Sequence, residues 1–335
     1  MMLLQSFSNR TSSYRTVSYR VIALAALSLS AATVASAQYI DQAAVEAVLE
    51  REQMPLEEIP DVYYEYYIFT HPDSNTVLAR NALYKYIGGG NARLGTDRAR
   101  LVEMINRVRM EDVEIGDTLV IPASLDTYEL DFRAYSPFPR YYSGGRDFDK
   151  LFIIDKSIQA WAAYEYGQLA RWGVVNTGSK ESPTPAGRYN FNWKEPYRVS
   201  SLSPPGEPWE MYWVFNIHEQ RGIHIHQYAF PTGGPTSHGC VRLIDADAKW
   251  IYNWADTWTR TGKGTGIAQG GRIIKQGTTV LVINEDPVGK PHPFEYKKRY
   301  PILHKVELPA HPYDVPPGTP QQEHFDRLRL QAASR

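Results

Sequence analysis

Residues 221–243 read RGIHIHQYAFPTGGPTSHGCVRL, and this stretch decides how the rest of the chain is interpreted. The alternation of Ile and His predicts a strand in which His224 and His226 share one face while the isoleucines occupy the other. The Gly- and Pro-rich loop that follows allows the chain to fold back and bring Cys240 to the histidine face. The stretch therefore predicts that a thiol and imidazoles gather at one place.

This combination of side chains is typical of nucleophilic catalysis. A thiol with a pKa near ~8.5 is only slightly ionised at neutral pH, and a neighbouring imidazole that accepts its proton creates the thiolate nucleophile. Gly239 permits an exposed turn whose backbone N–H groups can point at a developing oxyanion. Arg242 can hold a substrate carboxylate through paired hydrogen bonds. Together these residues predict acyl transfer on an acidic peptide.

Two alternatives remain open for the same residues. Cys240 can be a buried structural cysteine among satisfied core histidines, or it can belong to a zinc site. The zinc ligands would be His224, His226, His238 and Cys240. The carboxylates that usually support zinc-bound histidines are not evident nearby. We therefore expect no metal and no cofactor.

Composition excludes several classes of protein. The chain has 335 residues, with 36 Lys and Arg against 37 Asp and Glu. This length suits two folded units, and the near-neutral charge argues against a nucleic-acid binder that neutralises phosphates. A single cysteine excludes an intrachain disulfide and any multi-cysteine metal site.

The N-terminus has the parts of a secretory signal peptide. A leader containing Arg10, Arg15 and Arg20 has no acidic residue, and residues 21–34 (VIALAALSLSAATV) form a short apolar run. The small-residue triplet Ala-Ser-Ala at 35–37 is typical of a cleavage site. We predict that residues 1–37 are removed and that no stable membrane span remains, because the run is short and contains serine. An uncleaved signal anchor is the alternative.

The chain divides into five predicted segments. They are a signal peptide (1–37), an N-terminal module (38–126), a linker (127–149), a catalytic domain (150–286) and a Pro-rich C-terminal tail (287–335). In the N-terminal module, apolar spacing predicts helices at 43–54, 77–86 and 98–108 and a strand at 63–69, and residues 115–122 are predicted to form a turn into a short strand. This predicts a small α/β or α+β module. The tail either wraps the surface or is mobile.

The segment at 150–286 is predicted to be mainly β. Short β-type runs at 151–155, 160–165, 171–176 and 278–284 are separated by turns, which favours an antiparallel sheet or sandwich. One helix is expected, capped by Asp245 or Asp247. Its apolar face would carry Trp250, Ile251, Trp254 and Trp258 and pack on the sheet.

These motifs resemble those of a known family. The segment SHGCVRL at 237–243, preceded by GIHIHQY, resembles the signature of L,D-transpeptidases with a YkuD-like catalytic domain. Upstream, VNTG at 175–178 and TPAGRY at 184–189 resemble that family's V-x-T-G and T-P-x-G-x-[FY] elements. The resemblance spans about residues 151–284. It implies a YkuD-like β-sandwich with a packed helix, an exported protein of the periplasm or cell wall, and work on peptidoglycan stem peptides.

By motif position, the resemblance also implies roles for single residues. Cys240 would attack the diaminoacid–D-Ala bond of a tetrapeptide stem, release D-Ala, and form a thioester that an acceptor amine resolves into a cross-link. His238 and Gly239 would complete the catalytic motif, with His226 favoured as the base and His224 as the alternative. Three residues are expected to bind substrate, namely Arg242, Ser237 and Tyr228. Stem peptides and glycan would be the partners, without nucleic acid.

Alternatives to this function concern the acceptor and the N-terminal module. Water as acceptor would make the protein an L,D-carboxypeptidase or endopeptidase, and a peptidoglycan-binding structural protein is a third candidate. The stretch IGDTLVIP at 115–122, with Leu101 and Asn106 upstream, resembles the second half of a glycan-binding LysM module. A generic accessory domain is the other possibility for this module.

Overall fold

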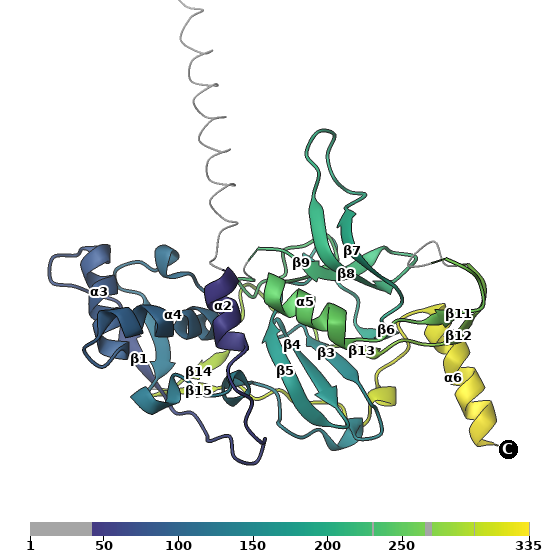
Figure 1. Cartoon of the computed structure of the whole chain (residues 1–335), viewed down its shortest axis with the longest axis horizontal. Coiled ribbons are helices and arrows are strands. Elements are labelled where there is room, and N and C mark those ends of the chain that lie inside the picture. Colours follow the sequence, from purple (N-terminus) through teal and green to yellow (C-terminus); the bar gives the residue numbers. More distant parts are fainter. Residues whose placement is uncertain (1–41, 230, 265–269, 298, 335) are drawn as a thin grey trace, which may run out of the picture. The chain divides into compact units, whose positions relative to one another are not determined.

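The computed structural model describes residues 42–229, 231–264, 270–297 and 299–334 (Figure 1). The described residues belong to one compact unit. The predicted signal peptide, residues 1–37, lies outside them. Among the described helices, none is both long enough and apolar enough to cross a membrane.

The N-terminal part combines helices with a pair of short strands. In chain order the elements are α2 (Gln42–Leu49), β1 (Tyr64–Ile68), α3 (Thr76–Ile87), α4 (Ala92–Asn106) and β2 (Thr118–Pro122). Asn75 and Asn91 start α3 and α4, because their side chains accept hydrogen bonds from backbone N–H groups of the first turn. β1 pairs antiparallel with β2. The expected order of elements is present, although α4 begins at residue 92 rather than 98.

A five-stranded sheet forms one half of the β-rich region, with the spatial order β5-β4-β3-β13-β6. Its strands are β3 (Leu151–Asp155), β4 (Ala160–Glu165), β5 (Gln168–Val174), β6 (Gly187–Asn190) and β13 (Thr279–Ile283). Every residue of β3 is buried, which is why this strand is almost continuously apolar in sequence.

A four-stranded sheet forms the other half, in the order β10-β9-β8-β7. Its strands are β7 (Lys194–Val199), β8 (Glu210–His218), β9 (Ile223–Gln227) and β10 (Val241–Leu243). Helix α5 (Asp245–Trp254) contacts β8 and β9. Both sheets and α5 contribute to one apolar core, which includes Phe152, Trp161, Phe215, Ile225, Ile251 and Val282. This confirms the predicted mainly β sandwich with a packed helix.

Two strand pairings differ from the antiparallel arrangement that the strand spacing suggested. β13 lies parallel to β3, and β10 lies parallel to β9. Parallel pairing needs a crossover of about a dozen residues or more. Both connections provide this length, since residues 156–278 separate β3 from β13 and residues 228–240 separate β9 from β10.

Helix α5 begins and ends at different residues from those predicted. Its N-cap is Ile244, so neither of the acidic candidates has the capping position. Asp247 is instead buried and accepts a hydrogen bond from Nε of Arg171 (3.1 Å). The helix ends at Trp254, because Ala255 is extended, and Trp258 therefore lies beyond the helix rather than on its apolar face.

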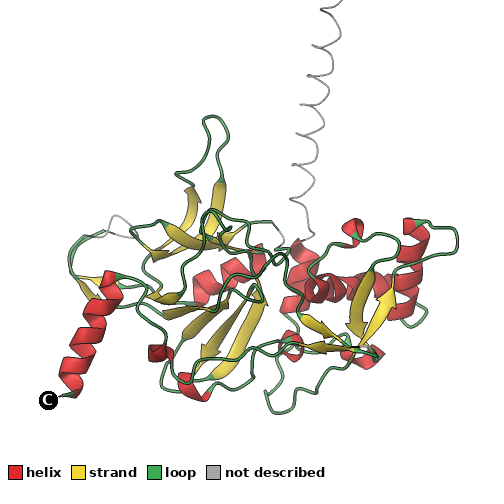
Figure 2. Cartoon of the chain, turned by 180° about the vertical axis from the view of Figure 1, so that it is seen from behind, coloured by secondary structure: helices red, strands yellow, loops and turns green. Residues whose placement is uncertain are grey.

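The C-terminal segment contacts the rest of the described chain through its strands and the first half of α6, whereas the second half of α6 projects away from it and is exposed (Figure 2). Its elements are β14 (Phe294–Tyr296), β15 (Pro301–Leu303) and α6 (Pro320–Ala333), after the small pair β11 (Thr259–Arg260) and β12 (Ile273–Lys275). The 3-10 helices are η2 (Met110–Asp112), η3 (Leu125–Thr127), η4 (Phe132–Tyr135), η5 (Ser143–Gly145) and η7 (Pro312–Asp314). Phe294 meets Tyr64 edge to face, and α6 supplies Gln322 and Asp326 to the buried guanidinium of Arg188. The tail therefore wraps the protein, although the five predicted segment boundaries stay predictions.

Candidate active site

Cys240 lies at the end of the loop that connects β9 to β10. The parallel register of these strands places Arg242 opposite His226. Cys240, two positions earlier, therefore comes beside His224: its Sγ lies 3.9 Å from Nδ1 of His224 and 4.0 Å from the carbonyl oxygen of Gly222. The thiol remains partly exposed. The structure thus brings the thiol and one imidazole into contact.

Both members of this pair are uncharged at neutral pH. Burial raises the pKa of the Cys240 thiol, and its bond to His224 and the charge of Arg242 offset this only in part. Burial, with smaller contributions from the charges of His226 and Arg198, lowers the pKa of His224 to about 3. The indole of Trp193 meets the His224 ring edge to face, with centroids 5.3 Å apart. The resting pair is therefore a thiol beside a neutral imidazole that can accept its proton.

His226 faces the same side of β9 as His224, as the alternation predicts. The intervening Ile225 lies in the core, whereas His226 and Cys240 line one cavity. Nδ1 of His226 lies 2.7 Å from the carbonyl oxygen of Gln227, and burial lowers the pKa of this imidazole to about 4. The strand register places His224, rather than the favoured His226, in contact with the thiol.

The turn before the cysteine is held by Ser237, which the sequence assigned to substrate binding. Its buried hydroxyl accepts a hydrogen bond from the N–H of Gly239 (3.0 Å) and donates one to the carbonyl oxygen of Cys240. His238 is exposed and stacks on Trp209 with ring centroids 5.4 Å apart. Ser237 therefore stabilises the turn, while His238 faces the neighbouring β7–β8 hairpin.

The two upstream motifs support this turn from the other side. The hydroxyl of Thr184 donates to the carbonyl oxygen of Gly239 (2.8 Å) and accepts from the N–H of Gly178 (2.9 Å). A Cβ on Gly178 would lie 2.9 Å from Cα of Gly239, so only glycine allows this approach. Gly239 itself has φ +112°, a conformation that favours glycine. The motifs were visible in sequence, but their supporting contacts were not.

Asn176 ties the loop to the same scaffold. Its backbone exchanges hydrogen bonds with Arg242 (3.1 and 2.9 Å), and its side-chain carbonyl accepts from the N–H groups of Gly233 and Gly234 (2.9 and 3.2 Å). The Gly-rich loop is therefore fixed at its middle as well as at both ends. Sequence reasoning assigned Asn176 no role, although it lies within the quoted VNTG motif.

A cavity of about 310 Å³ opens over the thiol. Its walls come from two places, the β7–β8 hairpin and the loop around the cysteine, and include Ser200, Leu202, Trp209, Glu210, His238 and Cys240. The hairpin residues were missed in the sequence, because no motif marks them and only tertiary packing brings them to the thiol. The volume suits a short peptide segment.

The remaining predicted substrate residues, Arg242 and Tyr228, also line this cavity. The guanidinium of Arg242 lies over the ring of Tyr228, 4.1 Å from its centroid. Nε of Arg242 is buried and has no hydrogen-bond partner among the described residues. A cation stacked on an aromatic ring, with a donor still available, can hold an anionic group.

The zinc alternative does not fit this arrangement. Within the described ranges, no three His, Cys, Asp or Glu side chains come together as metal ligands. His224 contacts the thiol, whereas His238 stacks on Trp209. The four candidate ligands therefore do not converge on one point.

Comparison with known proteins identifies the catalytic region. Residues 149–282 match the YkuD family, described as the L,D-transpeptidase catalytic domain. This part of the chain is therefore an enzyme domain of the L,D-transpeptidase type. A comparison with curated proteins finds no significant match.

Several solved structures of L,D-transpeptidases are similar to part of this chain. One from Mycobacterium smegmatis is 18% identical, covers 41% of this chain and 59% of its own, and has a TM-score of 0.31. One from Stackebrandtia nassauensis is 22% identical, covers 42% and 58%, and also has a TM-score of 0.31. L,D-transpeptidase 3 from Mycobacterium tuberculosis, with a faropenem-derived adduct, is 21% identical, covers 41% and 60%, and has the same score. The chain matches less than two thirds of the length of these proteins.

Proposed function

We propose that the protein is an exported cysteine L,D-transpeptidase that cleaves the diaminoacid–D-Ala bond of peptidoglycan tetrapeptide stems and transfers the acyl group to an amine. The observation that carries this proposal is the contact of His224 with Cys240, which lines the peptide-sized cavity, inside a domain that matches L,D-transpeptidases. Export to the periplasm or cell wall follows from the predicted signal peptide at 1–37 and from the location of peptidoglycan.

The first half-reaction is acylation of Cys240. As Sγ attacks the carbonyl carbon, the thiol proton passes to Nδ1 of His224, and the carbonyl oxygen becomes an oxyanion. Collapse of the intermediate breaks the C–N bond, and the imidazolium returns its proton to the departing amine of D-Ala. The neutral resting pair suits this sequence, because the imidazole is free to accept the proton when attack begins.

The second half-reaction reverses the roles of the same atoms. An acceptor amine attacks the thioester carbonyl, His224 takes a proton from that amine, and the C–S bond breaks. The imidazolium then protonates the Cys240 thiolate, which restores the resting pair. Because the N–H of Gly239 already donates to Ser237, we assign the oxyanion to the backbone N–H of Cys240.

We assign His224 as the base and Arg242 as the group that holds a substrate carboxylate. The argument for His224 is its distance to Sγ, and the argument for Arg242 is its position in the cavity wall together with an Nε that has no partner among the described residues. His226, between them in sequence, lines the cavity and hydrogen-bonds to the carbonyl of Gln227. We therefore assign it to the shape of the cavity rather than to proton transfer.

The decisive experiment measures D-Ala release and new dimers from purified tetrapeptide muropeptides by mass spectrometry. Cys240→Ala should abolish both products and should abolish the mass increase after treatment with a carbapenem; retained D-Ala release in this variant would refute the proposal. D-Ala release without any dimer would instead indicate water as the acceptor, and sacculus binding without turnover would indicate a structural protein.

Matched histidine variants test the assignment of the base. His224→Ala should lower the acylation rate by about 100-fold or more, the usual contribution of a general base. His226→Ala should retain a larger share of the rate, and His324→Ala, an exposed position on α6, should behave like the unmodified protein. A greater loss for His226→Ala than for His224→Ala would show that His226 is the base.

A further inference from the structure

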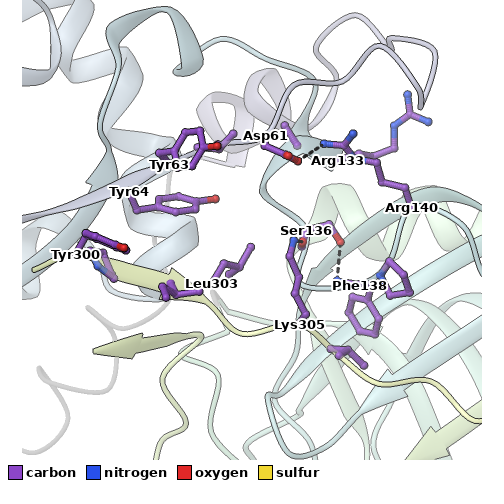
Figure 3. A pocket seen from close by; sticks show the side chains of 16 residues that line it. Asp61, Tyr63, Tyr64, Arg133, Ser136, Phe138, Arg140, Tyr300, Leu303 and Lys305 are labelled. Atoms are coloured by element: carbon purple, nitrogen blue, oxygen red, sulfur yellow. Dashed lines mark hydrogen bonds and ion pairs between the residues drawn. The ribbon is translucent and has the colours of Figure 1, made fainter. Parts of the chain in front are cut away.

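A second cavity, of about 730 Å³, lies outside the matched catalytic domain (Figure 3). Three separate segments line it: residues 61–64 at the start of β1, residues 133–140 before the catalytic region, and residues 300–306 of the C-terminal segment. None of these segments lies within residues 149–282. The cavity exists only because the tail packs beside the N-terminal module.

Aromatic rings form much of the cavity wall. Tyr63 and Tyr300 are 79% and 53% exposed, so they leave wide ring surfaces in solvent at the cavity. Phe138 is buried, and Leu303 adds an aliphatic side chain. Surfaces of this kind accept a ligand with a flat apolar face and a polar edge, because tyrosine offers both an apolar ring and a hydroxyl.

In the cavity lining, one buried hydroxyl lacks a hydrogen-bond partner among the described residues, and one ammonium group uses only part of its donors. Tyr64 is 7% exposed, and its hydroxyl has no partner among the described residues. Figure 3 shows this hydroxyl pointing toward the side of the cavity where Ser136 and Lys305 lie. Nζ of Lys305 donates to the carbonyl oxygen of Ser136 (3.2 Å), which uses one of its three N–H groups. A buried hydroxyl is seldom left without a partner in a folded protein.

Lys305 also carries the unbalanced charge of the cavity. The guanidinium of Arg133 is paired with Asp131, and that of Arg140 lies 3.3 Å from Asp61. No carboxylate within the described part of the chain forms an ion pair with Lys305; burial and the charge of Arg140 lower its pKa, and the charge of Asp61 opposes this in part. The lining therefore offers donors and one surplus positive charge, which an anion with acceptor oxygens would complement.

We propose that this cavity binds a sugar that carries a carboxylate, with the carboxylate held by Lys305 and the Tyr64 hydroxyl and the ring stacked on Tyr63 or Tyr300. The volume is in the range of cavities that hold ligands of one or two rings. The proposal rests on the proposed function only in the choice of probe, since N-acetylmuramic acid is an amino sugar of peptidoglycan whose lactyl carboxylate is free wherever no stem peptide is attached to it. Binding does not require the thiol.

The test is calorimetric titration of the Cys240→Ala protein with three probes. These are N-acetylmuramic acid, N-acetylglucosamine, which has the same ring without the carboxylate, and the dipeptide D-Ala–D-Ala, which has a carboxylate without the ring. N-acetylmuramic acid should bind about tenfold more tightly than either comparison probe. A difference of this size is expected when a ligand makes one additional charge-assisted hydrogen bond. Equal binding of both sugars, tighter binding of the dipeptide, or no binding of N-acetylmuramic acid would overturn the proposal.

Variants of the cavity locate the binding. Lys305→Gln should weaken the affinity for N-acetylmuramic acid about tenfold, and Tyr64→Phe, which removes one hydroxyl, about fivefold. Lys275→Gln, at an exposed lysine of β12 that does not line the cavity, should leave the affinity unchanged. If Lys305→Gln unfolds, Tyr64→Phe decides the question, and unchanged affinity in Tyr64→Phe would count against the site.

The same variants separate this proposal from the proposed function. With Cys240 restored, Lys305→Gln should still release D-Ala from soluble tetrapeptide muropeptides, because it does not line the cavity at the thiol. Loss of sugar binding with retained D-Ala release supports a separate site. Normal sugar binding without D-Ala release would contradict the transpeptidase assignment alone.

Discussion

The hydroxyl of Thr184 connects the two glycines on which the catalytic turn depends, and its removal is the most informative test of that turn. It accepts from the N–H of Gly178 (2.9 Å) and donates to the carbonyl oxygen of Gly239 (2.8 Å), and the side chain is fully buried. Valine has nearly the shape of threonine without the hydroxyl. Thr184→Val therefore removes both hydrogen bonds and leaves two buried backbone groups without partners.

The expected loss of stability follows from the two backbone groups that lose their partner, the N–H of Gly178 and the carbonyl of Gly239. An unsatisfied buried backbone group costs about 1–2 kcal/mol at a site that relaxes in part, so Thr184→Val should lower the free energy of unfolding by about 2–4 kcal/mol. If about 1.4–2 kcal/mol of this affects the position of Cys240, the acylation rate falls about 10- to 30-fold. Thr184→Ser keeps the hydroxyl and should restore most of the rate, with a small stability loss from the missing methyl.

Urea unfolding and the rate of carbapenem acylation, followed by mass spectrometry, measure the two effects separately. Thr259→Val, at an exposed threonine of β11, is the matched control and should change neither quantity. Unchanged acylation in Thr184→Val would refute the conclusion that this hydroxyl holds the turn. Equal losses in Thr184→Val and Thr184→Ser would point to packing of the side chain rather than to its hydrogen bonds.

Three further predictions concern the core, the tail and the thiol. Arg171→Met leaves the carboxylate of Asp247, which is 1% exposed, without its buried partner and should cost about 3–5 kcal/mol in urea unfolding; a loss below about 1 kcal/mol would contradict the pair's role. Truncation before residue 319 removes α6 from the buried Arg188 and should lower the melting temperature, whereas an unchanged value would show that the tail is dispensable. Because burial raises the pKa of Cys240 above 9.0 and lowers that of His224 to about 3, thiolate is scarce at pH 7. Alkylation by iodoacetamide should therefore rise about tenfold per pH unit between pH 6 and 8, and a plateau in that range would indicate a thiolate–imidazolium pair.

The chemical class of the site could be predicted from the sequence alone. His224, His226 and Cys240 are close in the chain, and the period of two in a strand places both histidines on one face. Helix α5 and the buried strands could also be predicted, because their apolar patterns depend on local sequence. The motifs around Gly178 and Thr184 could be recognised in the sequence, but their contacts with the turn before Cys240 could not be predicted from it.

The sequence by itself determined that a thiol and two imidazoles would share one face, and the tertiary structure decided which imidazole meets the thiol. That choice depends on the register of β10 against β9, which pairs Arg242 with His226 and so leaves Cys240 beside His224. Register between strands joined by a long loop is set by packing on both sheets, which no local pattern specifies. For the same reason, only the fold could place Tyr64, Ser136 and Lys305 around one cavity.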